Sequence, residues 1–137
     1  YCNGHDPSPD YKKVCTGETG HAEIVRIEFD PALISFEKLL DVFWRAHDPT
    51  TLNRQGADTG TQYRSGIYYH DEAQREIAEK SKAAAAKLWE APIVTEIEAL
   101  ENYHAAEDYH QDFYRNNPGN PYCMVSIPPK LKKLGLS

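Results

Sequence analysis

A carboxylate stands among apolar residues in the segment that runs from Glu23 to Phe29. If this segment is a strand, alternate side chains share a face, and Glu23 lies on the same face as Val25, Ile27 and Phe29. A carboxyl group on an apolar face loses solvation, which raises its pKa and lets it act as a general acid near neutral pH. Glu23 is therefore the first candidate catalytic residue. A neutralising partner is the other explanation for its position.

Tyrosines and cysteines could complete such a site. Polar residues with catalytic potential concentrate in three segments, 11–23, 53–63 and 103–123. Tyrosine hydroxyls can hold a polar oxygen, and cysteine supplies a nucleophile or a redox partner. Ordinary interpretations exist as well, since Tyr11 can be a partly buried aromatic residue and Asp58 a turn residue. Taken together, the residue types indicate thiol chemistry on a polarised oxygen.

Composition limits the class of protein. A chain of 137 residues with 40% hydrophobic and 26% charged residues predicts a single globular domain over 1–137. The formal net charge of -6 argues against nucleic-acid binding, and no apolar run is long enough to span a membrane. Three cysteines without a C-x-x-C pair argue against a structural zinc site and a disulfide scaffold. Unpaired thiols favour a cytoplasmic location.

Helical and strand patterns alternate along the chain. We expect a strand over 21–30, a helix capped by Ser35, a helix capped by Asp71, and further strands at 67–70 and 92–100. A short helix is expected over 106–117, and the polar segment 50–66 reads as a functional loop. The pattern predicts an α+β fold, namely a two-layer mixed-sheet sandwich with flanking helices and a long, largely irregular C-terminal tail.

Four motifs resemble the peptide methionine sulfoxide reductase A family. They are YKKVCTGETGHAEIV, FWRAHDPTTLNRQGADTGTQYRSGIYY, PIVTEI and AEDYHQDFYRNNP, and the resemblance runs from Tyr1 to Cys123. It implies reduction of methionine S-sulfoxide, free or in proteins, to methionine. The route would pass through a cysteine sulfenic acid and a disulfide that thioredoxin reduces. The resemblance implies no metal and no organic cofactor.

The resemblance also implies roles for individual residues. Glu23 matches the acid that protonates the sulfoxide oxygen, and Tyr11 and Tyr63 match the tyrosines that hydrogen-bond this oxygen. Asp58 matches a residue that shapes the site and holds the substrate. Cys123 is similar to the first recycling cysteine of the family.

The Gly-Cys-Phe-Trp motif that carries the nucleophile in this family does not occur in the sequence, where the only Phe-Trp pair is Phe43-Trp44. We therefore expect the chain to lack the first strand and first helix of the domain, and to be inactive in isolation. One alternative is a truncated or relic domain that binds methionine-containing peptides. Another is a metal or redox-sensing domain that uses Cys2, His5 and His21.

Overall fold

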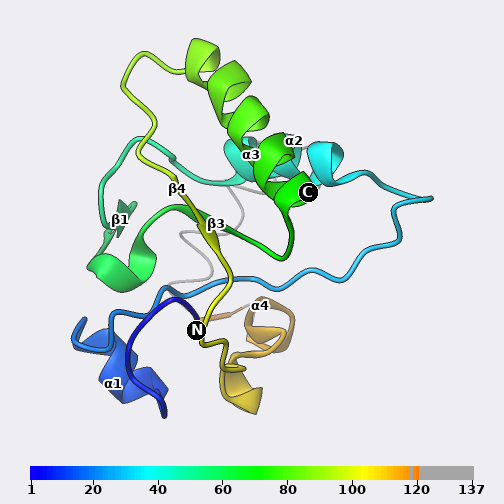
Figure 1. The fold of residues 1–137 in the computed structure, drawn as a ribbon. Coiled ribbons are helices and arrows are strands. Elements are labelled where there is room, and N and C mark those ends of the chain that lie inside the picture. The colour runs from blue at the N-terminus through cyan, green and yellow to red at the C-terminus, as the bar shows by residue number, and fades with distance from the viewer. Residues whose placement is uncertain (118, 121–137) are drawn as a thin grey trace.

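The computed structural model describes residues 1–117, 119 and 120, in which helices pack beside two small sheets (Figure 1). Residues 121–137, which form nearly all of the tail expected to be irregular, lie outside this range. The elements, in chain order, are α1 (Tyr11–Cys15), α2 (Phe36–Ala46), β1 (Arg54–Gln55), β2 (Asp58–Thr59), the 3-10 helix η1 (Thr61–Tyr63), β3 (Gly66–Tyr69), α3 (Glu72–Ala85), η2 (Ala86–Leu88), β4 (Glu96–Ala99), η3 (Asp108–His110) and α4 (Phe113–Asn116).

The two longest helices begin at the caps that the sequence predicts. The Ser35 hydroxyl accepts a hydrogen bond from the Lys38 amide at 3.1 Å, and α2 starts at the next residue. The Asp71 carboxylate accepts from the Gln74 amide at 2.8 Å in front of α3. Each side chain satisfies one of the amides that a helix start leaves without an internal partner. Both capping predictions are confirmed.

The hydrophobic core lies between these helices and β3. Leu40 and Trp44 of α2 pack with Ile67 of β3 and with Ala78 and Ala85 of α3. The indole nitrogen of Trp44 donates a hydrogen bond to Ser81 Oγ at 2.8 Å, so its polar atom is satisfied in the buried position. The core therefore holds α2 and α3 together.

Both sheets are two-stranded, and they differ in direction. β3 and β4 run parallel, with Gly66 opposite Glu96 and Tyr69 opposite Ala99. β1 and β2 form a small antiparallel hairpin within the loop expected over 50–66. The combination of helices and small mixed sheets is the α+β class that the sequence predicts.

The strand expected over 21–30 is not formed. Ala22 makes a single bridge to Cys2, and residues 23–30 are extended without a paired strand among the described residues. Val25 is 83% exposed and Ile27 is 56% exposed, so the middle of the apolar face predicted to be buried is exposed. Alternation identifies two faces of an extended segment, but burial requires a second layer against one of them.

The helix expected over 106–117 is divided into two short pieces, η3 and α4. Asp112 lies between them with φ 51°, which is the left-handed region and cannot continue a right-handed helix.

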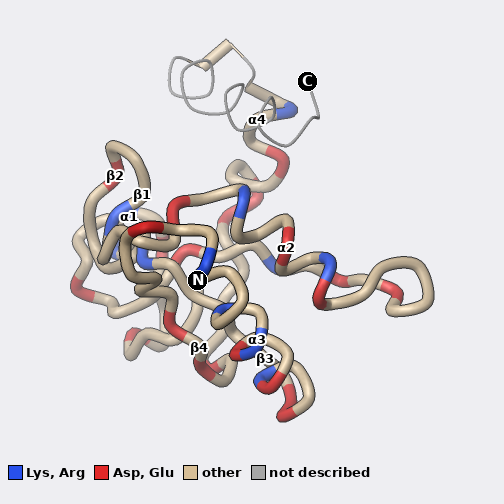
Figure 2. Tube along the Cα trace, turned by 90° about the horizontal axis from the view of Figure 1, so that it is seen from above, with Lys and Arg blue, Asp and Glu red and all other residues tan. Residues whose placement is uncertain are grey.

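Among the described residues, no helix combines the length and apolarity needed to cross a membrane. Lys and Arg positions are interspersed with Asp and Glu positions along the described residues (Figure 2).

Candidate active site

One cavity of about 1180 Å³ is lined by Tyr11, Glu23, Asp58 and Tyr63. These residues come from α1, from the extended segment after Ala22, from β2 and from η1 (Figure 1). They are the candidate site residues that the sequence singles out within the described range. The fifth candidate, Cys123, lies outside the described residues.

Glu23 is half-buried at this cavity, and its backbone amide donates to the Gln62 carbonyl oxygen at 2.8 Å. Burial raises the pKa of the Glu23 carboxyl, and the negative charge of Asp58 raises it further. The carboxyl thus retains its proton to a higher pH than an exposed glutamate. The strand on which the sequence prediction rested is not formed, and Val25 and Ile27 are exposed, but the predicted rise in the pKa of Glu23 is present.

Tyr11 is the first residue of α1, where Asp10 caps the helix by accepting from the Lys13 amide at 2.8 Å. Its side chain is 39% exposed. A hydrogen bond with Cys15, one turn further on, raises the pKa of Tyr11 to about 12, and the nearby Tyr63 and Glu23 contribute to the increase. The Tyr11 hydroxyl is therefore protonated near neutral pH and can donate a hydrogen bond.

Asp58 and Tyr63 are brought to the cavity by the hairpin and the turn that follows it. Asp58 pairs with Gln55 across the hairpin, whose turn contains Gly56 at φ 56°. Positive φ at this position suits glycine, because a side chain would clash with the backbone. Tyr63 is the last residue of η1 and is half-buried.

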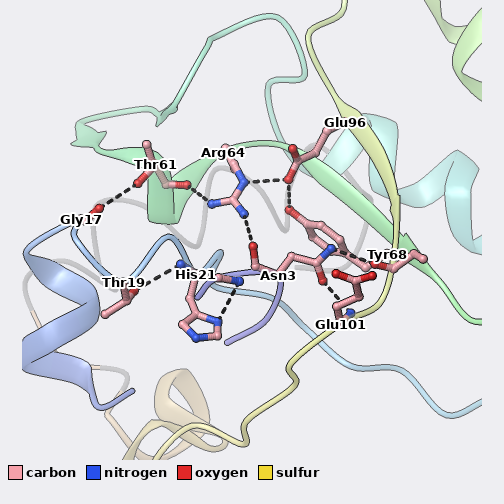
Figure 3. A network of polar contacts seen from close by, with 11 residues as sticks. Asn3, Gly17, Thr19, His21, Thr61, Arg64, Tyr68, Glu96 and Glu101 are labelled. Carbon is pink, nitrogen blue, oxygen red and sulfur yellow. Dashed lines mark hydrogen bonds and ion pairs between the residues drawn. The ribbon is translucent and has the colours of Figure 1, made fainter. Parts of the chain in front are cut away.

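A polar network holds η1 against the parallel sheet (Figure 3). Arg64 donates through Nε to Glu96 Oε1 at 2.7 Å and through Nη1 to the Thr61 carbonyl at 2.9 Å. Tyr68 donates to the same Glu96 oxygen at 2.5 Å. Because Arg64 follows Tyr63 directly, this network fixes the chain on which the Tyr63 side chain is mounted.

His21 supports the segment that carries Glu23. The ring is 1% exposed, its Nδ1 accepts from the Gly4 amide at 3.2 Å, and its Nε2 donates to the Asp6 carbonyl at 2.8 Å. Both ring nitrogens therefore have hydrogen-bond partners within the protein. In the described part of the chain, no group of three or more His, Cys, Asp or Glu side chains could hold a metal ion.

Two cysteines lie in the described range, and neither lines the cavity. Cys2 is fully buried, and burial raises the pKa of its thiol to about 11. Cys15 is exposed, and both thiols are free. The Cys2 thiol is protonated near neutral pH and is a poor nucleophile in this state.

The sequence only partly revealed the rest of the cavity wall. Segment 103–123 stood out in the sequence for its polar residues, but Cys123 was its only residue with an assigned role. In the structure this part of the wall is strongly aromatic and includes Tyr103, His104, Tyr109, His110, Phe113 and Tyr114. Tyr1 also lines the cavity and is 5% exposed. No pattern in the sequence marked it as a site residue.

The chain matches known proteins over nearly its whole length. The family profile described as peptide methionine sulfoxide reductase matches residues 1–136. The peptide methionine sulfoxide reductase MsrA of Chromobacterium violaceum is 53% identical over 136 residues, which cover 98% of this chain and 77% of that protein. The protein of the same name from Saccharolobus solfataricus is 53% identical over 133 residues, covering 97% of this chain and 75% of the relative.

Solved structures agree with the sequence comparison. The reduced form of Mxr1 from Saccharomyces cerevisiae superposes with a TM-score of 0.85 at 41% identity, covering 90% of this chain and 71% of that chain. Methionine sulfoxide reductase A of Corynebacterium diphtheriae superposes with a TM-score of 0.73 at 41% identity, covering 84% of this chain and 60% of that chain. On these grounds the chain belongs to the peptide methionine sulfoxide reductase family, a family of oxidoreductases.

Proposed function

We propose that this chain carries the substrate-binding and proton-donating part of an enzyme that reduces methionine S-sulfoxide, free or in proteins, to methionine. One observation carries the proposal: Glu23, whose pKa is raised by burial, lines the same cavity as Tyr11 and Tyr63. A carboxylic acid and two phenolic hydroxyls around one cavity suit a substrate whose polar oxygen must be held and protonated. The relatives named above bear the name of this activity.

In the proposed reaction, the Tyr11 and Tyr63 hydroxyls donate hydrogen bonds to the sulfoxide oxygen, and Asp58 helps to shape the site. A thiolate attacks the sulfoxide sulfur, Glu23 donates its proton to the oxygen, and the oxygen is transferred to the thiol sulfur. The products are methionine and a cysteine sulfenic acid. A second thiol then condenses with the sulfenic acid, which releases water and leaves a disulfide.

The thiols of this cycle are assigned by family pattern. The attacking thiol belongs to the Gly-Cys-Phe-Trp motif, which is not among the 137 residues of this sequence. Cys123 is assigned as the recycling thiol, and thioredoxin as the dithiol that reduces the resulting disulfide. The free thiols of Cys2 and Cys15 fit the reducing environment of the cytoplasm, where we place the protein.

The direct test is an activity assay on the complete gene product and, in parallel, on the 137-residue chain. Each protein is incubated with the separated S and R epimers of methionine sulfoxide and dithiothreitol, and methionine is quantified by chromatography. We expect the complete product to consume the S epimer and the 137-residue chain to be inert. A complete product that converts neither epimer would refute the proposal.

The absence of the Cys-Phe-Trp motif from the sequence favours one alternative, a relic domain that binds methionine-containing peptides without chemistry. Calorimetric titration with a peptide that contains methionine or methionine sulfoxide distinguishes the two. Saturable binding by a complete gene product that lacks reductase activity would support the relic. Turnover of the sulfoxide peptide to the methionine peptide would exclude it.

A further inference from the structure

We propose that Glu107 is a positioning residue for Tyr11 and that it acts together with His110. This inference rests on the proposed function, in which the Tyr11 hydroxyl binds the sulfoxide oxygen. Glu107 itself is not among the residues that line the cavity, so it would act on the substrate through Tyr11.

Glu107 ties the start of α1 to the segment before η3. Its Oε1 accepts a hydrogen bond from the backbone amide of Tyr11 at 3.0 Å, across 96 residues of sequence. Its Oε2 accepts from the hydroxyl of the buried Tyr1 at 3.0 Å. The Tyr11 amide is one of those at a helix start that no carbonyl of the helix can satisfy, so Glu107 supplies a partner that the local chain lacks.

His110 restrains the Tyr11 side chain from another direction. The two rings lie with their centroids 4.5 Å apart and their planes at 51°. His110 Nε2 lies 3.3 Å from Glu107 Oε2, three residues earlier in the chain, and forms no hydrogen bond with any described group. Both side chains are partly shielded, with 25% of His110 and 28% of Glu107 exposed.

The two contacts restrain Tyr11 at different points. Glu107 fixes the backbone on which the side chain is mounted, and His110 limits the tilt of the ring. The hydroxyl is the atom farthest from the backbone, so a small tilt displaces it more than any other atom of the residue. A displacement of about 1 Å at a reacting centre can lower a rate by about 100-fold, so these restraints bear on catalysis.

The test compares variants of the complete gene product, with and without the Tyr11 hydroxyl. Glu107→Ala removes both acceptor oxygens, and Glu107→Gln keeps one that can accept from the Tyr11 amide. Glu101→Ala is the matched control, because Glu101 is exposed and, within the described part of the chain, forms hydrogen bonds only through its backbone. For each variant, kcat and KM for methionine S-sulfoxide are measured, and the melting temperature reports on folding.

We expect Glu107→Ala to lower kcat by about tenfold with a smaller change in KM, because positioning acts mainly in the transition state. Glu107→Gln and Glu101→Ala should retain kcat within about threefold of the parent, which is a small part of the effect that misplacement can cause. In a Tyr11→Phe background, Glu107→Ala should lower kcat by less than about twofold, because the effects of coupled residues are not additive.

If Glu107→Ala lowers kcat equally with and without the Tyr11 hydroxyl, its role is purely structural and the inference is overturned. The inference is also overturned if Glu107→Ala is as active as Glu101→Ala. If Glu107→Ala does not fold, His110→Leu is judged by the same comparison with and without the Tyr11 hydroxyl. A parent protein that reduces no methionine sulfoxide would refute the proposed function itself. A parent that turns over normally while the variants fail these tests would refute only the positioning role.

Discussion

Glu23 links the chemistry of the site to pH at the scale of a single residue. Its pKa is raised by burial and by Asp58, so the protonated form persists above the usual range of a glutamate. If this form is the proton donor, activity falls as pH rises through the raised pKa. Glutamine cannot donate in this way, so Glu23→Gln should lower kcat/KM by about 10²–10⁴-fold and abolish this falling limb.

The measurement is a pH series of kcat/KM with methionine S-sulfoxide at saturating dithiothreitol. Glu98→Gln serves as the control, because Glu98 is an exposed residue of β4 outside the cavity. Retention of full activity by Glu23→Gln across the series would remove Glu23 from the mechanism. Loss of activity in the control as well would point to a general effect on folding.

The same pKa shift predicts a pH-dependent change in stability. Below the ordinary pKa of glutamate, about 4.3, Glu23 is protonated in the folded and unfolded states and costs nothing. As pH rises above this value, the unfolded chain loses its proton first, so the folded state binds more protons and becomes relatively less stable. The loss levels off above the raised pKa of the folded state.

Glu23→Gln removes this titration and should therefore melt at a higher temperature than the parent at neutral pH, with the difference shrinking towards about pH 4. Melting curves by circular dichroism across this pH range provide the measurement. A difference that grows on acidification would contradict the direction of the pKa shift.

Helix starts make the clearest prediction at the scale of secondary-structure elements. Ser35→Ala and Asp71→Ala each remove a side-chain acceptor from a helix amide and should lower the free energy of unfolding by about 1 kcal/mol. Urea denaturation of each variant measures the change. Lys80→Ala is the control on α3, because Lys80 is exposed and far from the cap. A cap variant as stable as this control would contradict the prediction.

Connections between distant segments decide the stability of the whole molecule. Arg64 reaches the Asn3 carbonyl at 3.4 Å as well as Glu96, so it joins the start of the chain, η1 and β4 (Figure 3). Its side chain is only 16% exposed, which limits the compensation that water can offer if the contacts are lost.

Arg64→Met should therefore lower the free energy of unfolding by about 2 kcal/mol, as hydrogen bonds to charged groups do. Arg75→Met is the control, because Arg75 pairs with Glu72 and Glu79 on the exposed face of α3, where ion pairs contribute little. Urea denaturation of both variants makes the comparison. Equal effects of the two substitutions would show that the Arg64 network does not stabilise the fold.

Local features of the chain were determined by the sequence alone. The α2 and α3 helices, their caps at Ser35 and Asp71, and strands β3 and β4 follow from patterns within a few residues, because capping and helix periodicity are local. The long motifs were specific enough to indicate the family, and they contain the four candidate residues that line the cavity.

Only the tertiary structure decided which side chains are buried and which meet. The alternation around Val25 and Ile27 predicted a buried face, but the described residues place no second layer against it. Glu23 is desolvated all the same, at a cavity whose wall includes segments that lie far from it in sequence. The contact between Glu107 and the Tyr11 amide spans 96 residues, so no local pattern encodes it. Burial and long-range contacts depend on how distant segments pack, and this is why the acid, the tyrosines and their supports become one site only in the folded molecule.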